Sequence, residues 1–290
     1  MSEAAVKTGI GPTVSVAIEQ LFPEEQRILQ DDLAYAILPF GMRMLVGVMR
    51  ISSIRDWMVR EAEKSAPGIW GGLMCRKRYI DEKLLQSASH MDAIVNLGAG
   101  FDTRIYRLPA LAKIPVWEVD HMENIKPKKA RLEKHFGEIP AHIKLVTIDF
   151  DREELGPVLT ANGYSPDQKT FFIWEAVTQY LTPQSIENTF AYLAQAAPGS
   201  RLTFTYILKD FLDGTEMYNQ QTVYKQYVDK NQTWRFGLHP QDIPAFLNQY
   251  GWQLIEDIGN DDMAEKYVKP THRQLGIMAI ERMVYAEKVG

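Results

Sequence analysis

The segment Ala93-Ile-Val-Asn-Leu-Gly-Ala-Gly-Phe-Asp-Thr-Arg-Ile-Tyr-Arg-Leu108 decides the fold of this chain. It begins with a largely apolar run over residues 93–97, which is typical of a buried β-strand. The run passes directly into a turn that carries Gly98 and Gly100. Glycines at these positions let the backbone bend tightly and approach a ligand closely, because no Cβ stands in the way. The segment therefore predicts the first strand and turn of a nucleoside-binding βαβ unit.

The residues after the turn indicate which nucleoside binds. A dinucleotide fingerprint needs a third small residue and an open helix N-terminus for the pyrophosphate. Here the third position is Thr103, and Asp102 precedes it. A carboxylate at the mouth of the turn would repel a pyrophosphate but would suit the sulfonium and amino groups of S-adenosylmethionine. We therefore expect S-adenosylmethionine as the cofactor and regard a nicotinamide oxidoreductase as a less favoured alternative.

These residues resemble the leucine carboxyl methyltransferase family, in particular its bacterial-type branch of S-adenosylmethionine-dependent methyltransferases. The resemblance extends over nearly the whole chain, with Lys77 where threonine is usual and Ala176 where glycine is commoner. The matching segments are Arg76–Asp81, Asn96–Leu108, Trp117–Asp120, Val146–Phe150, Trp174–Leu181, Trp234–Pro240 and Arg282–Glu287.

The resemblance implies an α/β fold: a Rossmann-like, seven-stranded class I methyltransferase sheet with helices on both faces and an antiparallel last strand. Apolar runs in the sequence agree with seven strands, and Thr182-Pro183 and His239-Pro240 are typical starts of helices between them. The predicted strands are 93–97, 116–120, 144–149, 171–176, 202–208, 253–258 and 277–286.

Two regions do not follow this alternation. Residues 1–90 predict helices only, over 14–29, 34–59 and 70–89, so we expect a helical N-terminal extension and a methyltransferase core over 91–290. Residues 209–238, which we call the lid segment, are polar but contain several aromatic residues. We expect both regions to cover the carboxyl edge of the sheet, where ligands bind in such folds; surface decoration is the alternative.

Several side chains are candidates for cofactor binding. Gly98, Ala99 and Gly100 would face the methionine half and the ribose. Asp120 ends the second strand, where a carboxylate can accept the ribose hydroxyls; Glu118 lies on the same strand face and is an alternative. His121 follows at the cofactor edge.

The remaining candidates lie at helix and strand ends. Arg76 could bind the methionine carboxylate through its planar guanidinium, with Arg78 as the alternative. Asp149 and Phe150 would meet the adenine. Glu175 ends an apolar run where an unpaired carboxylate is costly, so we expect a partner such as the methionine ammonium. Ala176 follows it.

The sequence leaves the methyl acceptor open. None of the six histidines forms a recognisable pair with a carboxylate, and a carboxylate nucleophile needs no general base whereas a hydroxyl benefits from one. This favours O-methylation of a small-molecule carboxylate, and no catalytic residue is assigned. Tyr206, Trp234 and Phe236 are predicted to form walls of the substrate site; alternatively these rings only fill the seam between lid and sheet.

Composition limits the other functions. A net charge of −5 does not indicate the basic surface that nucleic-acid binding requires. The single cysteine, Cys75, cannot form an intramolecular disulfide, so we expect a small buried side chain in a reducing cytoplasm. No metal site is predicted.

The sequence shows no targeting or membrane-spanning segment. It opens Met1-Ser-Glu without the features of a signal peptide, and charged residues interrupt the most apolar window, 38–58. We expect a cytoplasmic enzyme with a small-molecule substrate and no nucleic-acid or membrane partner. A nucleoside-binding protein without turnover is the alternative from another class.

Overall fold

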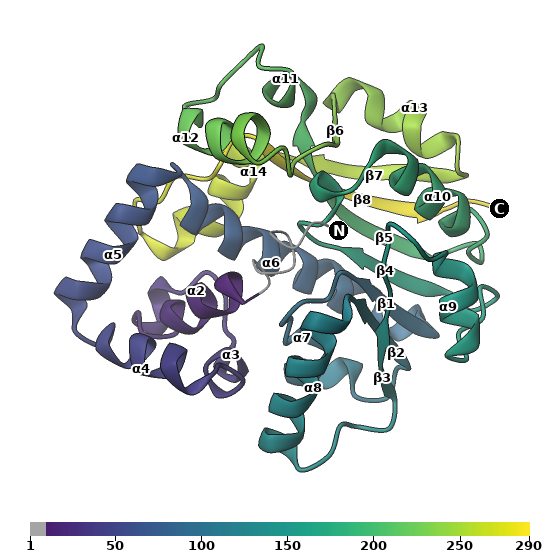
Figure 1. The fold of residues 1–290 in the computed structure, drawn as a ribbon, viewed down its shortest axis with the longest axis horizontal. Coiled ribbons are helices and arrows are strands. Elements are labelled where there is room, and N and C mark those ends of the chain that lie inside the picture. Colours follow the sequence, from purple (N-terminus) through teal and green to yellow (C-terminus); the bar gives the residue numbers. More distant parts are fainter. Residues whose placement is uncertain (1–9) are drawn as a thin grey trace.

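The computed structural model describes residues 10–290, and one sheet forms its centre (Figure 1). The strands follow the order β3-β2-β1-β4-β5-β8-β7, and the short β6 pairs with the end of β5. Their bounds are Ala93–Leu97 for β1, Val116–Asp120 for β2, Ile143–Thr147 for β3, Thr170–Trp174 for β4, Arg201–Leu208 for β5, Gly237–Leu238 for β6, Trp252–Ile258 for β7 and Glu281–Lys288 for β8.

The direction of the strands confirms the expected fold class. Strands β1 to β5 are parallel, and β8 is inserted antiparallel between β5 and β7. The chain runs outward from β1 to β3 and then returns to place β4 on the other side of β1. Such a reversal opens a crevice at the carboxyl ends of β1 and β4, where α/β sheets bind their ligands.

Both faces of the sheet are covered, as the apolar strands predict. Successive side chains of a strand point to opposite faces, so Phe171 and Ile173 join one buried cluster while Phe172 and Trp174 join another. Helices α9 (Leu155–Ala161), α10 (Pro183–Leu193) and α13 (Ile243–Asn248) cover the second face. Helix α6 (Ile69–Ser87) crosses the first face. Beside the sheet edge lie α7 (Arg104–Arg107) and α8 (Met122–Phe136).

The last strand begins later than the sequence predicts. Residues 277–280 lie outside the strand, although the carbonyl of Ile280 accepts from the N–H of Leu208 in β5. The backbone N–H of Met278 donates to the carbonyl of Gly68, at 3.0 Å, and holds this stretch against the start of α6. The predicted third and fourth strands also end early, at Thr147 and Trp174. In the fourth, the reason is that Ala176 adopts a left-handed conformation, with φ of +55°, which no strand can continue through.

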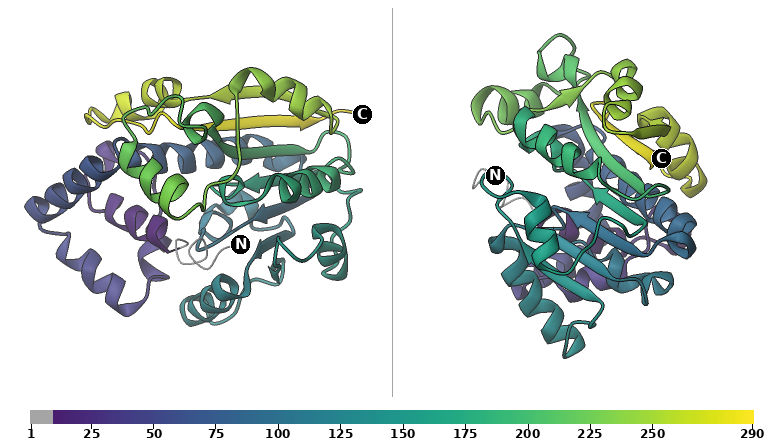
Figure 2. Two further views of the ribbon diagram at one scale, coloured as in Figure 1. Left: turned by 45° about the horizontal axis from the view of Figure 1, so that its top comes forward. Right: turned by 90° about the vertical axis from the view of Figure 1, so that its right-hand side faces the viewer.

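The N-terminal region is helical, but its first two predicted helices are broken into shorter pieces. Pro23 and Pro39 interrupt them, because a proline disfavours the helical conformation of the residue before it. The pieces are α2 (Gly11–Glu19), η1 (Glu24–Gln26), α3 (Asp32–Ala36), α4 (Phe40–Val48) and α5 (Ser52–Ser65). They gather beside the sheet (Figure 2, left). Their buried residues form one cluster with α6 and the first sheet face, so the domain boundary near residue 90 stays a prediction.

The lid segment consists of short helices: α11 (Lys209–Leu212), α12 (Gln221–Val223) and the π-helix η5 (Tyr224–Lys230). Besides the pairing of β6 with β5, hydrogen bonds tie it to the rest of the molecule, and one of them runs from Arg235 Nη2 to the carbonyl of Tyr180 at 2.7 Å. The Gln220 side-chain amide donates to the carbonyl of Pro67 at 2.6 Å, and the backbone N–H of Arg235 donates to the carbonyl of Gln179 at 2.7 Å. The segment therefore spans from the N-terminal helices to the loop after β4.

Within residues 10–290, no helix is both long and apolar enough to cross a membrane. The expectation about a signal peptide concerns Met1 to Glu3, which lie outside the described residues. Cys75 is fully buried, as expected, and burial raises the pKa of its thiol to about 12.

Candidate functional site

A cavity of about 680 Å³ opens at the carboxyl ends of β1, β2 and β4, within the roughly 300–1,000 Å³ of typical ligand sites. Helices α5 and α6 and the lid segment supply its other walls. One end is charged and the other is apolar and aromatic. The charged end includes Arg76, Lys77, Asn96, Asp102, Asp120, Glu175 and Glu281. The aromatic end is formed by Tyr180, Tyr227 and Trp234, whose rings contact one another. Apolar residues that include Leu73, Val177, Ile207, Val223 and Met278 complete the lining.

The glycine turn lies in the cavity wall as predicted, with Gly98, Ala99 and Gly100 all in its lining. Both glycines have positive φ, +70° and +45°. A Cβ added to Gly98 would also come within 2.3 Å of a methyl carbon of Val177. Glycine is thus required at this position for its conformation and for the close approach of the next loop.

The structure distinguishes Asp120 from Glu118. Asp120 lines the cavity, and its carboxylate accepts hydrogen bonds from the backbone N–H of Gly100 (2.5 Å), the backbone N–H of His121 (2.6 Å) and the amide of Asn124 (2.9 Å). Glu118 is fully buried elsewhere and bonds to Lys128 and Tyr106. Asp120 is therefore held in a fixed orientation at the mouth of the turn.

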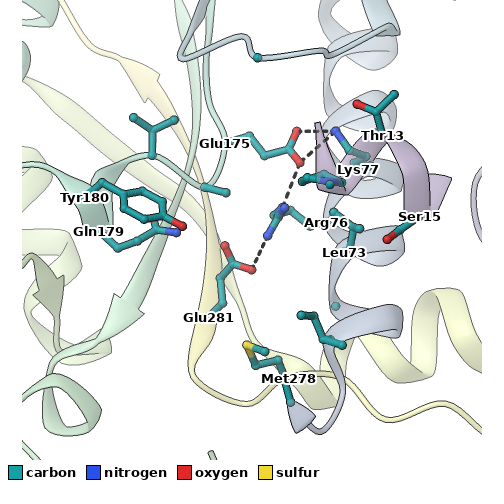
Figure 3. Close-up of a pocket in the computed structure, with 18 of the residues that line it drawn as sticks. Thr13, Ser15, Leu73, Arg76, Lys77, Glu175, Gln179, Tyr180, Met278 and Glu281 are labelled. Atoms are coloured by element: carbon teal, nitrogen blue, oxygen red, sulfur yellow. Dashed lines mark hydrogen bonds and ion pairs between the residues drawn. The ribbon is translucent and has the colours of Figure 1, made fainter. Parts of the chain in front are cut away.

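Glu175 is surrounded by three cations of the protein itself, two of which, Arg76 and Lys77, are seen in Figure 3. Its carboxylate lies 3.0 Å from Arg76 Nε, 3.3 Å from Lys77 Nζ and 2.5 Å from Arg104 Nη2. Burial raises the pKa of this carboxyl, but the attraction of Lys77, Arg104 and Arg76 outweighs burial and lowers the pKa to about 2. The costly unpaired carboxylate expected from the sequence is thus already paired without any ligand.

Arg76 connects Glu175 to a second carboxylate. Its Nη1 donates to Glu281 Oε2 at 2.7 Å, and Figure 3 shows the guanidinium between the two acids. Arg76 lines the cavity, whereas Arg78 faces a different hollow at the far side of α6. The other oxygen of Glu281, Oε1, is buried and accepts no hydrogen bond from any residue in the described range.

One electrostatic expectation needs correction. Asp102 lines the cavity, but the fully buried Arg104 pairs with it, with Nε 3.0 Å from Oδ2. Despite burial, which raises it, the pKa of Asp102 lies far below its ordinary value, because Arg104, Lys77 and Lys128 attract the charged form. Asp102 is thus a neutralised partner within an ion-pair cluster, so its expected repulsion of a pyrophosphate does not by itself distinguish the two cofactors.

Three predicted cofactor residues are absent from the cavity lining. His121 instead caps the start of α8, where its Nδ1 accepts from the backbone N–H of Glu123. Phe150 is buried in the core of the second sheet face. Asp149 organises a tight turn, with its backbone carbonyl accepting from Arg152 and its carboxylate from Asp151. These residues thus follow the ends of β2 and β3 without lining the cavity.

Of the predicted substrate walls, only Trp234 lines the cavity. It stacks on Tyr227 with ring centroids 4.9 Å apart. Tyr206 is fully buried and donates to Asp257 at 2.9 Å; strand alternation gives the cavity its neighbour Ile207 instead. Phe236 packs against Phe246 outside the lining.

Several lining residues were not predicted to contact ligand. Tyr227 could have been predicted from the sequence, because it is one of the aromatic residues of the lid segment. Gln179 and Tyr180 lie in the loop after β4, and Glu281 reaches the site only because β8 inserts beside β5. Two polar atoms at this end, Trp234 Nε1 and Gln179 Oε1, are buried without a hydrogen-bond partner among residues 10–290. That same range contains no cluster of side chains suited to a metal ion.

Comparisons with known proteins agree with this architecture. A protein of Mycobacteroides abscessus assigned to the S-adenosyl-L-methionine-dependent methyltransferases is 30% identical over 205 residues, which cover 69% of this chain and 66% of that protein. A Mycobacterium tuberculosis protein with the same assignment is 26% identical over 259 residues, covering 85% and 83% of the two chains.

Among solved structures, one from Thermobifida fusca described as a methyltransferase superposes with a TM-score of 0.59 at 17% identity, covering 80% of this chain and 86% of that one. It supports the fold alone. The model of the leucine carboxyl methyltransferase family matches residues 9–194, which is more than half of the sequence. This chain therefore belongs to the leucine carboxyl methyltransferase family.

Proposed function

We propose that this protein transfers a methyl group to the carboxylate of a small, largely apolar molecule. Its membership of the family makes it a methyltransferase, and its methyl donor is S-adenosylmethionine. The observation that supports a small apolar carboxylate as the acceptor is that the cavity has a charged end and an aromatic end. The charged end has the fixed carboxylates and cations that suit the polar groups of the cofactor, and the aromatic end is apolar with two unpartnered polar atoms.

The charged end fits the cofactor. The glycine turn lies in the cavity wall beside Asp120, with positive φ at both Gly98 and Gly100. Asp120 Oδ2 accepts only the Gly100 N–H within the described chain, so it retains a lone pair for a ribose hydroxyl. Glu281 Oε1 is free to accept the methionine ammonium, and Arg76, with Nε and Nη1 engaged, would offer Nη2 to the methionine carboxylate. When bound, the cofactor supplies an electrophilic methyl group on a sulfonium.

The aromatic end fits an acceptor that is already ionised. No histidine occurs among the described lining residues. The carboxylates of Asp102 and Glu175 are held in ion pairs, so neither is available as a general base. A carboxylate needs no base. The N–H of Trp234 could donate to it, since Trp234 lines the cavity and its buried Nε1 has no partner among residues 10–290.

The covering of the cavity supports a small acceptor rather than a protein tail. The hydrogen bonds from Gln220 to Pro67 and from Arg235 to Gln179 fix the lid segment to both sides of the opening. Tyr227 and Trp234 then form a stacked wall that excludes water from the site. Holding donor and acceptor in line within about 3–3.5 Å is the main contribution that such a site makes to catalysis.

A methyl-transfer screen tests the proposal. The protein is incubated with S-adenosylmethionine labelled in its methyl group and with panels of small apolar acids, phenols and peptides that end in a free carboxylate. Products are then treated with alkali, which releases volatile methanol from esters but not from ethers. We expect alkali-labile label with small acids. Alkali-stable product with phenols would make the protein a hydroxyl methyltransferase, and preference for the peptides would contradict a small acceptor.

The same material tests the non-catalytic alternative. If S-adenosylmethionine binds but no member of the panels is methylated, the protein is a nucleoside-binding protein of this fold. Calorimetry with NAD covers the remaining alternative, because tighter binding of NAD than of S-adenosylhomocysteine would exclude the proposed function.

A further inference from the structure

Helix α4 (Phe40–Val48) is apolar around its whole circumference. Its sequence contains a single charged residue, Arg43, and Val46 is its only buried residue. A helix of this composition is normally buried on all sides. Phe40, Met44 and Val48, which the helical spacing places in one row, are instead 72%, 58% and 48% exposed.

The exposed surface continues past the end of the helix. Ile51, in the turn before α5, and Trp57, in the second turn of α5, are 56% and 57% exposed. Helices α4 and α5 lie at the outer edge of the molecule, away from the sheet (Figure 1). Scattered apolar side chains on a surface are ordinary, but a contiguous group marks an interaction site. We call residues 40–57 the α4–α5 surface.

The charge of this surface indicates what covers it. The sequence contains no acidic residue between Asp32 and Asp56, although the whole chain carries a net charge of −5. Arg43 and Arg50 lie among the exposed apolar residues. Burial is the larger effect on Arg131 of α8, but Arg43 is also near enough to lower the pKa of its guanidinium. Asp56 is the acid within residues 40–57, and it lies 3.4 Å from Arg55, so the positive charge of Arg43 and Arg50 is not matched by it.

We propose that the α4–α5 surface docks on an anionic lipid bilayer. Apolar side chains, a tryptophan and flanking arginines on a short helix are the composition with which proteins lie in a membrane interface. A second copy of the chain suits the surface less, because self-association would bring two sets of unpaired arginines together. The expectation of no membrane partner rested on the lack of a spanning helix, and peripheral docking replaces it.

The position of the surface relates the docking to the cavity. Met58 and Ala62, which follow Trp57 on α5, line the cavity. Docking would thus hold one wall of the cavity close to the lipid, from which an apolar acid could enter. The docking itself does not depend on the proposed methyl transfer, and it can be measured without cofactor or acceptor.

Co-sedimentation with vesicles tests the proposal. Vesicles of phosphatidylcholine and phosphatidylglycerol in equal parts are compared with vesicles of phosphatidylcholine alone. We expect binding to the mixed vesicles that weakens at high salt. The double variant Phe40→Ser/Met44→Ser should lower the partition coefficient about tenfold or more. Arg43→Gln and Arg50→Gln should each lower it about fivefold.

A matched control removes two exposed apolar residues elsewhere. Ile255→Ser/Val289→Ser replaces side chains that are 48% and 39% exposed on another part of the surface, and it should bind vesicles like the wild type. Thermal unfolding verifies that every variant is folded. Absence of wild-type binding, equal binding to both vesicles, or an equal loss in the control overturns the proposal. A wild-type dimer that Phe40→Ser/Met44→Ser converts to a monomer would show that the surface joins two copies.

Discussion

The two ends of the cavity are built differently. The charged end is fixed by buried ion pairs, with Glu175 held by Arg76, Lys77 and Arg104 at once. The aromatic end is held by stacked rings and single hydrogen bonds, and it retains unpartnered polar atoms. Charges that are held by several ion pairs at once resist change, whereas an end that is built on short lid helices can be altered locally. This contrast suits a constant cofactor at one end and a variable acceptor at the other.

Removal of Glu175 should have the largest effect. Glu175→Ala leaves Arg76, Lys77 and Arg104 close together without their shared carboxylate, so we expect a loss of about 3–5 kcal/mol in the free energy of unfolding, as for other broken buried pairs. Urea denaturation measures it. Glu61→Ala is the control, because Glu61 forms an exposed pair with Lys64 and should change the free energy by less than about 1 kcal/mol. Equal losses would show that the cluster does not stabilise the fold.

The same carboxylate should make stability depend on acid. The pKa of Glu175 in the folded protein is about 2, below the ordinary value of 4.5. Its contribution is therefore complete above about pH 4.5 and is lost as the pH falls towards 2. Denaturation at several pH values should show a steeper acid decline for the wild type than for Glu175→Gln. Parallel curves would contradict the lowered pKa.

A smaller change is expected at the glycine turn. Asp120→Asn replaces an acceptor of the Gly100 and His121 N–H groups by an amide, which still offers one acceptor, so we expect the binding of S-adenosylhomocysteine to weaken by about 0.5–1.5 kcal/mol. Isothermal titration calorimetry measures the loss. Asp149→Asn is the informative control: the sequence predicts that Asp149 contacts the adenine, but the cavity lining excludes it. Equal losses in both variants would favour the sequence prediction.

A change at the aromatic end should alter the KM for the methyl acceptor. Trp234→Phe keeps a ring but removes the N–H, and we expect the KM for the acceptor to rise about fivefold, the equivalent of one hydrogen bond of roughly 1 kcal/mol. The affinity for S-adenosylhomocysteine should not change. Phe236→Leu, which alters a ring outside the lining, should leave KM as it is. Weaker cofactor binding with unchanged KM would show that Trp234 only fills the seam between lid and sheet.

The smallest effect is expected at Ala176, between the two ends. Its φ of +55° is left-handed, which costs an alanine about 1–2 kcal/mol, whereas glycine loses about 0.5–1 kcal/mol of backbone entropy. Ala176→Gly should therefore stabilise the fold by about 0.5 kcal/mol, visible as a higher melting temperature. Ala130→Gly, in the exposed middle of α8, should lower it. A lower melting temperature for Ala176→Gly would indicate that the methyl group of Ala176 contributes needed packing.

The local pattern of apolar residues predicts the parallel strands of this fold well. Strands β1 and β2 have the predicted bounds, because their apolar runs end at glycine or aspartate. The N-terminal helices were predicted too long, because the apolar residues around Pro23 and Pro39 continue a helical spacing that proline interrupts. The antiparallel position of β8 followed only from the family resemblance, since the spacing of apolar residues carries no strand direction.

For the site, residue type was a better guide than side-chain direction. Gly98, Asp120, Arg76 and Glu175 all line the cavity. Tyr206 does not, because a shift of one residue along a strand moves a side chain to the other face. Partners distant in sequence were also beyond local reasoning: Arg76 meets Glu175 and Glu281, which are 99 and 205 residues away. The sequence marked Glu175 as costly to bury but did not show which charges of the protein would neutralise it.

The antiparallel insertion of β8 has a consequence for synthesis of the protein. Strand β5 pairs with β8 along most of its length, and the first residue of β8, Glu281, completes the carboxylates around Arg76. A ribosome delivers residues 281–288 after every other wall of the cavity. A nascent chain that stops before residue 281 should therefore expose the edge of β5 and lack a finished cofactor site, however well its first four strands have paired. If Glu281 binds the cofactor as proposed, a nascent chain gains its full affinity for S-adenosylmethionine only after translation has passed this strand.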